Sequence, residues 1–379
     1  MSIKNYTFLV VFIRKFVSKF SGIDLVFSTS LDFFGVPMNV FCTKFFLLLI
    51  TSIPFSLQAF GIWQCAGMLI PELNPLCWDA CGFEVGAELL YLKRCGDSDR
   101  VNFTSNGISG PIVLHSDLLD PGWEWGYQLV GQVNLKGNKA VEIVWMPGIC
   151  WNASEKVQDQ NHQLYSIYSD FGQDPLGGFP YSDQSGEQSI AFESKLQTVE
   201  VNVKRLWGIF RGAFLYGYRY QCLHEDLKYQ TTGLAESNWY RSSTEATNDM
   251  HGFQLGMNIC FPCTSCFSFE LFGKGAVYAN CTQYELFATA GSASKELKQK
   301  ESSTRTSWGI DAGAKLLYEW SMGSHFYIGY QYLSYRNIAL AIDNFFKQPP
   351  LNTALQDKVL VNDSNLSYHG MSIGLHVIY

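Results

Sequence analysis

Residues 366–379 read LSYHGMSIGLHVIY, and this stretch decides the fold. Every second residue from Met371 to Tyr379 is apolar, whereas most of those between, such as Ser372 and His376, are small or polar. A period of two predicts a β-strand with two unlike faces. The stretch also stops on an aromatic residue, without a polar tail. This is typical of the closing strand of an outer-membrane β-barrel, whose apolar face meets lipid and whose polar face meets the lumen. We expect Tyr379 to act as its assembly signal.

The composition agrees with a membrane barrel. The 379 residues are 47% hydrophobic, 15% aromatic and only 16% charged, with a mean hydropathy of −0.01. A value near zero is expected when only alternate residues face lipid. The net charge of −7 argues against nucleic-acid binding, which requires a basic face. Length alone also fits two soluble domains, so it does not decide the class.

The first 81 residues indicate that the protein is exported, and they do not contribute to the predicted fold. The apolar run FFLLLITSIPFSL at 45–57 follows Lys44 and precedes Ala59. It is shorter than a membrane-spanning helix and resembles the core of a secretory signal peptide. We therefore expect 38–59 to be a cleaved signal peptide that starts at Met38, after a non-native or extended segment 1–37. Residues 60–81 are then a periplasmic segment that contains cysteines. A long, uncleaved signal anchor is the alternative, and the choice between Met1 and Met38 stays open.

Ten stretches with a period of two run through residues 82–379, the last of them the stretch at 366–379, and each has an apolar and a polar face. Strand 82–94, for example, carries Phe83 and Val85 on one side and Glu84 on the other. An antiparallel, up-and-down transmembrane β-barrel of ten strands is the predicted fold, all-β in class. The predicted strands are 82–94, 122–133, 139–151, 190–204, 208–226, 247–261, 265–284, 304–320, 325–338 and 366–379.

The connections between these strands alternate between long and short. Long connections cover 95–121, 152–189, 227–246, 285–303 and 339–365, and the short ones cover 134–138, 205–207, 262–264 and 321–324. Short periplasmic turns and long outer loops produce this alternation in outer-membrane barrels. A hairpin missed inside 152–189 would raise the strand number to twelve.

The polar faces of the strands place charged side chains in the lumen. Charged rings set the ion selectivity of a pore. Eight acidic against five basic side chains predict a weak preference for cations, if the lumen is open. The alternative is that the charges pair and plug a narrow barrel, because ten strands enclose less space than the 16–18 of wide porins. The predicted pore-lining residues are Glu84, Glu88, Glu124, Glu142, Glu200, Lys204, Arg211, Arg219, Glu270, Lys274, Asp311, Lys315 and Glu319.

Several of these strands also resemble a known family. The stretches FEVGAELLYLK (83–93), LQTVEVNVK (196–204), FRGAFLYGYRYQCLH (210–224), FQLGMN (253–258), LFGKGAVY (271–278) and WGIDAGAKL (308–316) are similar to strands of Legionella-type major outer membrane proteins. They also resemble the porin-like proteins of chlamydia-related bacteria and barrels of planctomycetes. The resemblance covers roughly 82–379 and implies a pore-forming or surface-structural barrel. These families more often end on Phe than on Tyr, and they supply no catalytic residues.

The chain contains 11 cysteines, a high number for such a barrel. Cys77 and Cys81 precede the first strand, while Cys260, Cys263 and Cys266 surround a predicted short turn. Export favours disulfides, for instance Cys77–Cys81 or Cys260–Cys266. A zinc site at 260–266 lacks a fourth ligand at the usual spacing, so we predict no metal. Intermolecular disulfides to neighbouring envelope proteins are a third possibility, which fits the resemblance to chlamydia-related porins. We expect Cys222 and Cys281 to be buried.

We predict no enzyme and no cofactor. His224 with Asp226, and His251 with Asp249, share a strand face near the outer rim, so each pair could touch as in a hydrolase. No nucleophile motif accompanies them, and ordinary polar rim residues explain them more simply.

Two functions follow. The first is passive diffusion of small hydrophilic solutes or ions through a porin-like outer-membrane barrel. The second is a surface-structural or adhesive role of a barrel with an occluded lumen, acting through loops 152–189 and 339–365 and through cysteine links. The expected partners are outer-membrane lipid, the barrel-assembly machinery, and a homo-oligomer or disulfide-linked envelope proteins.

Overall fold

A computed structural model describes residues 82–97, 100–135, 137–174, 182–207, 212–233, 238–291, 296–321, 324–345 and 360–378. The predicted signal peptide, Cys77, Cys81, Arg211 and Tyr379 lie outside the described residues. Within the described residues, no helix is both long enough and apolar enough to span a membrane.

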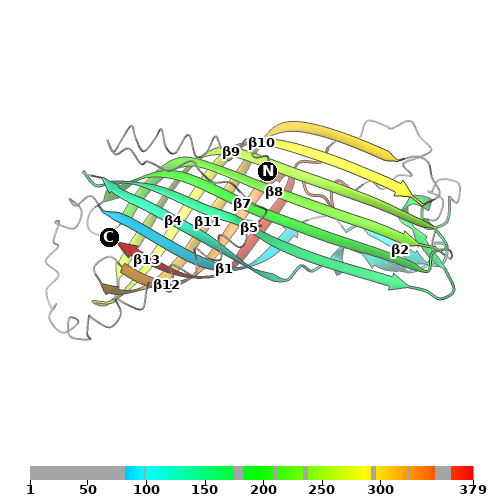
Figure 1. The fold of residues 1–379 in the computed structure, drawn as a ribbon, viewed down its shortest axis with the longest axis horizontal. Helices are drawn as coiled ribbons and strands as arrows, with labels where there is room; N and C mark the ends of the chain where they lie inside the picture. Colours follow the sequence, from blue (N-terminus) through cyan, green and yellow to red (C-terminus); the bar gives the residue numbers. More distant parts are fainter. Residues whose placement is uncertain are drawn as a thin grey trace, which may run out of the picture. The chain divides into compact units, whose positions relative to one another are not determined.

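Ten antiparallel strands form a closed barrel, which confirms the predicted fold (Figure 1). Strands adjacent in the chain pair with each other, and β1 closes the ring by pairing with β13, from Glu84 opposite Ile378 to Asp97 opposite Asn365. The barrel strands are β1 (Phe83–Asp97), β4 (Trp123–Leu135), β5 (Lys139–Gln158), β7 (Glu187–Trp207), β8 (Gly212–Thr232), β9 (Trp239–Pro262), β10 (Phe267–Ala290), β11 (Leu297–Ser321), β12 (Ser324–Ile338) and β13 (Ser364–Ile378).

The apolar faces predicted for these strands point outward and form one apolar band around the barrel. Leu255 on β9, Ile310 on β11 and Ile373 on β13 are examples, each more than half exposed. Aromatic rings border the band near the short turns, where Trp207 stacks on Phe214 with centroids 4.8 Å apart. Such aromatic girdles mark the two interfaces of a membrane barrel.

A second aromatic girdle borders the band at its other edge. Tyr91 stacks on Trp125 at 4.5 Å, and the rings of Trp123 and His369 meet edge to face at 5.4 Å. Tyr330 OH lies 2.7 Å from His369 Nδ1 in a hydrogen bond. We call this the outer girdle, because it lies on the side of the long connections.

The barrel strands from β5 to β11 are longer than the other four and continue beyond their outer ends (Figure 1). We call this part of the barrel, which lies beyond the outer girdle, the outer extension. The predicted long loops 227–246 and 285–303 are therefore wrong: the connections are only 233–238 and 291–296. Inward and outward side chains still alternate along these strands, but in the extension the polar side chains point outward and the apolar ones inward. On β8, Tyr216 faces outward and Arg219 inward near the short turns, whereas Lys228 faces outward and Tyr229 inward in the extension.

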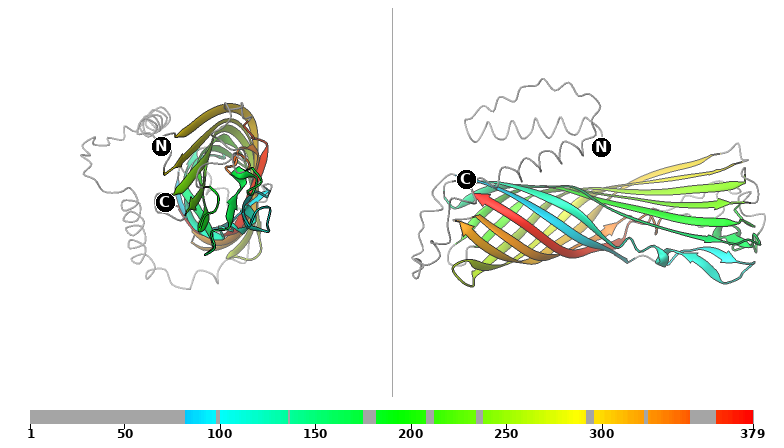
Figure 2. Two further views of the ribbon diagram at one scale, coloured as in Figure 1. Left: turned by 90° about the vertical axis from the view of Figure 1, so that its right-hand side faces the viewer. Right: turned by 60° about the horizontal axis from the view of Figure 1, so that its bottom comes forward.

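The alternative of a further hairpin within 152–189 is not realised in the barrel among the described residues. Residues up to Gln158 continue β5, after an irregularity between Met146 and Ile149 that moves Trp151 to the inside. Strand β6 (Leu164–Ser166) instead joins β2 (Asn102–Asn106) and β3 (Ile112–His115) in a separate sheet. This sheet lies at the end of the outer extension (Figure 2). Two short 3₁₀ helices follow its strands, η3 (Ser116–Leu118) and η4 (Ile167–Ser169).

Candidate functional site

Charged side chains meet inside the barrel at the level of the apolar band. We call this set the lumen charge layer, and all its members were predicted to face the lumen. Its members are Glu88, Glu142, Glu200, Asp311, Lys204, Arg219, Lys274 and Lys315.

Glu200 on β7 lies at the centre of the layer. Arg219 Nη2 is 2.8 Å from Glu200 Oε1 and 3.2 Å from Asp311 Oδ2, so one guanidinium joins strands β7 and β11 across β8 to β10. Lys274 Nζ lies 3.1 Å from Glu200 Oε2, to which Gln254 Nε2 also donates a hydrogen bond of 2.8 Å. Buried charges are tolerated when they are paired and hydrogen bonded in this way.

Two further ion pairs complete the layer. Lys204 on β7 pairs with Glu142 on β5, and Lys315 on β11 lies 3.2 Å from Glu88 Oε1 on β1. The layer therefore balances four acidic groups against four basic ones. A neutral layer offers no excess charge for selecting cations, in contrast to the eight-to-five count over all predicted lumen residues.

The lumen is packed at this level. Each of the ten strands contributes an inward-pointing side chain at this level. All ten side chains are largely or fully removed from solvent, so the lumen is filled by protein here. Glycines make room for large neighbours: a Cβ on Gly374 would lie 2.1 Å from the Tyr327 ring, and one on Gly86 would lie 2.3 Å from His376. The inward residues are Glu88, Gln132, Glu142, Asn202, Arg219, Gln254, Lys274, Asp311, Tyr327 and Ser372.

The other predicted pore-lining residues that the structure describes lie on the inward face but outside the layer. Glu84, near the short turns, accepts hydrogen bonds from Gln132 Nε2 at 2.9 Å and pairs with His376 Nδ1 at 2.8 Å. Glu124, Glu270 and Glu319 are half-buried, and Glu270 stands opposite Lys315 in the β10–β11 register.

A second closure lies further out, where the chain after β12 turns into the barrel. Residues 339–342 and Phe345 are buried, and we call 339–345 the inner turn. Asn248 on β9 holds it with two hydrogen bonds, donating to Ala339 O at 2.7 Å and accepting from Ala339 N at 2.9 Å. The predicted outer loop 339–365 thus begins inside the barrel instead of projecting to the surface.

A buried ion pair between β1 and β8 also supports the inner turn. Arg94 Nη2 on β1 lies 2.5 Å from Glu225 Oε1 on β8. Glu225 also accepts hydrogen bonds from Ser194 Oγ at 3.1 Å and from Ala341 N at 3.1 Å. Arg94 and Glu225 were not among the predicted site residues. The alternation could have found them, since Arg94 shares the face of Glu88 and Glu225 shares the face of Arg219.

The loop 152–189 also contributes to the interior of the outer extension. Tyr168 of η4 is buried and hydrogen bonded to Ser242 Oγ at 3.0 Å. Its ring packs near Tyr240 and Phe345 in an apolar core. Burial raises the pKa of Tyr168 to about 12. Burial likewise raises the pKa of Asp183, which accepts a hydrogen bond from Ser166 N at 2.8 Å.

The cysteines of the short turn face different ways. Cys260 points inward and is buried, whereas Cys263 is an exposed, free thiol. In the part of the chain that the structure describes, no group of three or more His, Cys, Asp or Glu side chains could hold a metal ion. Cys222 is half-buried and Cys281 is exposed on the outer surface, so the expectation that Cys281 is buried is wrong.

The two histidine–aspartate pairs of the rim do not form. His224 Nδ1 is hydrogen bonded to Thr247 Oγ1 at 2.9 Å, and His251 Nδ1 to Tyr218 OH at 2.6 Å. Asp226 pairs instead with Lys228 at 2.7 Å. The two residues of each pair are separated along the strand, and each side chain lies closer to a residue on the neighbouring strand than to the other member of its pair. Each histidine therefore bonds across to the neighbouring strand.

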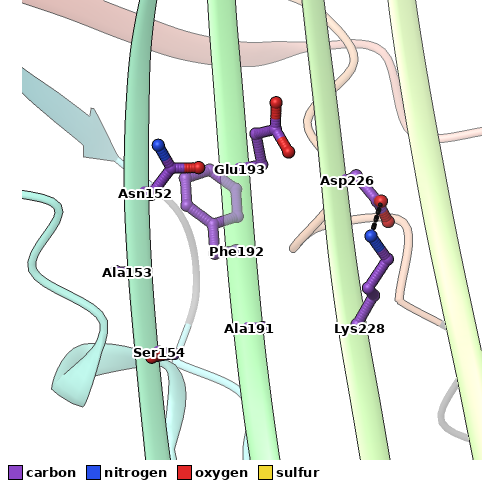
Figure 3. Close-up of a pocket in the computed structure, with 8 residues that line it drawn as sticks. All are labelled: Asn152, Ala153, Ser154, Ala191, Phe192, Glu193, Asp226 and Lys228. Atoms are coloured by element: carbon purple, nitrogen blue, oxygen red, sulfur yellow. Dashed lines mark ion pairs between the residues drawn. The ribbon is translucent and has the colours of Figure 1, made fainter.

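A shallow pocket of about 270 Å³ lies over β5, β7 and β8 in the outer extension. Its wall includes Asn152, Glu193, Asp226 and Lys228, and the side chains of Asp226 and Lys228 point toward one another (Figure 3). Because its only cationic group is already paired with Asp226, the pocket offers no unpaired cation with which to hold an anion.

No protein-family model matches the chain, and no characterised protein matches it in sequence. Solved structures resemble it in fold. The outer membrane protease OmpT of Escherichia coli is 10% identical, with 79% of this chain and 97% of that chain covered and a TM-score of 0.42. A major outer membrane protein of Thermus thermophilus is 11% identical, with 79% and 100% covered and a TM-score of 0.31. A FadL homologue of Pseudomonas aeruginosa is 8% identical, with 79% and 90% covered and a TM-score of 0.20. At these identities none of their activities transfers to this chain, which is a closed ten-stranded antiparallel β-barrel.

Proposed function

We propose that this protein is an outer-membrane β-barrel with a closed lumen, which serves a structural or adhesive role at the cell surface. The observation that carries the proposal is the packed lumen at the level of the lumen charge layer, where each of the ten strands contributes an inward side chain that is largely or fully removed from solvent. The apolar band and its two girdles support placement in the outer membrane, with the short turns in the periplasm.

The occluded barrel is favoured over passive diffusion for two reasons. A hydrophilic solute would have to displace several paired, buried charges, and breaking a buried ion pair costs about 3–5 kcal/mol. The inner turn then blocks the same path a second time, held by Asn248 and Glu225. The function therefore belongs to the outer extension, whose outward face is polar. Insertion by the barrel-assembly machinery, oligomerisation and disulfide links to neighbours stay predictions.

Conductance in a planar lipid bilayer tests this proposal. The refolded, full-length protein should insert without discrete openings. In a background that carries Asn248→Ala, which removes both hydrogen bonds that hold the inner turn, the double variant Glu200→Ala/Arg219→Ala removes an ion pair from the centre of the layer and should conduct more than Asn248→Ala alone. The matched double variant Arg241→Ala/Glu245→Ala changes the same charges on the outward face of β9 and, in the same background, should conduct no more than Asn248→Ala alone. Stable openings of the wild type would overturn the proposal and restore the porin interpretation.

A further inference from the structure

A second outward pocket, of about 200 Å³, lies over β12, β13 and β1. Its place in the barrel follows from the register of β12 and β13. Going outward, consecutive outward-facing pairs are Ile328 with Ile373, Tyr330 with Met371, Tyr332 with His369, Ser334 with Ser367 and Arg336 with Asn365. The sequence of side chains changes from aliphatic through aromatic to hydroxyl and finally to cationic, as the surroundings of a bilayer change from acyl chain to headgroup.

The pocket occupies the polar end of this series. Tyr332, Ser334, Arg336, Asn365 and Ser367 line it, so the outer girdle forms its lower edge. Its volume is below the 300–1,000 Å³ that is common for drug-sized ligands, and fits a single small headgroup instead.

Arg336 supplies the charge of the pocket. Its side chain is exposed and makes no ion pair or hydrogen bond with any other described residue. Two other cations in this part of the barrel are already engaged: Lys93 on β1 is paired with Asp120 at 3.3 Å, and Arg305 on β11 is hydrogen bonded to Asn362. Asp363, one outward position beyond Asn365, limits the cationic surface on its outer side. A guanidinium beside the hydroxyl of Ser334 and the amide of Asn365 matches a phosphate group, because the planar fork donates to two oxygens at once. The hydroxyl of Ser367 already donates to Cys95 O at 3.3 Å.

We propose that this pocket binds the phosphorylated headgroup of a lipid in the outer leaflet, whose acyl chains then lie along Ile328 and Ile373. The binding would fix the depth of the barrel in the membrane. The site rests on the membrane placement of the proposed function, but not on the closed lumen, so a conducting wild type would leave it intact.

Native mass spectrometry of the refolded, full-length protein tests the site with two probes, phosphorylated lipid A and the same lipid after dephosphorylation. The wild type should retain the phosphorylated form preferentially. Arg336→Gln should weaken that retention about tenfold or more, as expected for loss of a charge-assisted hydrogen bond. Arg241→Gln, an equal change of charge on the distant outer extension, should have no effect.

A second variant tests whether the polar groups beside Arg336 contribute to binding, independently of the charge. Ser334→Ala/Ser367→Ala keeps the charge and should weaken binding by a smaller factor, while circular dichroism reports that all variants fold. Equal retention by Arg336→Gln and the wild type would overturn the proposal, as would equal binding of the dephosphorylated lipid. Displacement of the lipid by soluble glucosamine phosphate at equal concentration would show that the pocket takes free phosphate esters, and would also overturn it.

Discussion

The same strands pass through two regions of opposite design. Within the apolar band, β8 points Tyr216 outward and Arg219 inward; in the outer extension it points Lys228 outward and Tyr229 inward. Lipid surrounds the first region in our proposal and water surrounds the second, so each outer face matches its solvent. The interior then takes the opposite character: paired charges in the band and an apolar core in the extension. The polarity of a barrel interior thus follows from what lies outside it.

The largest effect should come from an unpaired charge within the band. Arg219→Ala leaves Glu200 and Asp311 without their shared partner. We expect the free energy of unfolding to fall by about 3–5 kcal/mol, measured by urea unfolding of the refolded protein in lipid vesicles. Arg241→Ala in the extension removes an exposed arginine that stacks over Trp239, and should cost less than about 1 kcal/mol. Equal losses in the two variants would show that the charge layer is hydrated.

The outer faces of the two regions can be compared on a single strand. Leu255 and Thr247 both point outward from β9, the first in the apolar band and the second beyond the outer girdle. Leu255→Arg should destabilise the barrel by about 2–4 kcal/mol, because a cation would face the middle of the bilayer. Thr247→Arg should cost about 0–1 kcal/mol, since it faces water or the headgroups. Urea unfolding of the two variants measures both losses of stability. Similar losses for Leu255→Arg and Thr247→Arg would show that the membrane boundary does not lie between these two positions.

The smallest effect concerns the apolar core of the extension and depends on pH. The pKa of Tyr168 is about 12 in the folded protein, above the usual value near 10 in an unfolded chain. The folded protein therefore holds this proton more tightly. The resulting stability is fully present below pH 10 and is lost as the pH rises from about 10 to 12. Tyrosine absorbance and tryptic cleavage of the extension should report this loss.

Tyr168→Phe is the matched variant. It removes the hydrogen bond to Ser242 and should cost about 1 kcal/mol at neutral pH. It should also make the alkaline loss shallower, because one buried hydroxyl no longer ionises. An alkaline transition unchanged in this variant would assign the effect to other groups.

Local alternation was sufficient to predict the ten strands, their outward faces and the inward position of the charges. It placed Glu200 and Arg219 on one side of their strands, because a period of two depends only on neighbouring residues. It did not predict that Arg219 also reaches Asp311, since that contact depends on strand tilt and barrel closure. The outer ends of the strands were missed for a different reason: we required an apolar outward face, and beyond the girdle the apolar face turns inward. The inner turn gave no signal, as Ala339 and Ala341 look like ordinary loop residues.

The closing of the ring by β1 and β13 has a consequence for how quickly the barrel can form. These two strands lie at opposite ends of the described chain, yet they pair continuously from Glu84 opposite Ile378 to Asp97 opposite Asn365. Contacts between residues so distant in sequence are entropically costly to make and slow folding. Until they form, both strands present unpaired edges and Glu88 has no Lys315 to meet. We therefore expect closure to be the slowest step of refolding, and the lumen to become dry only when it is complete.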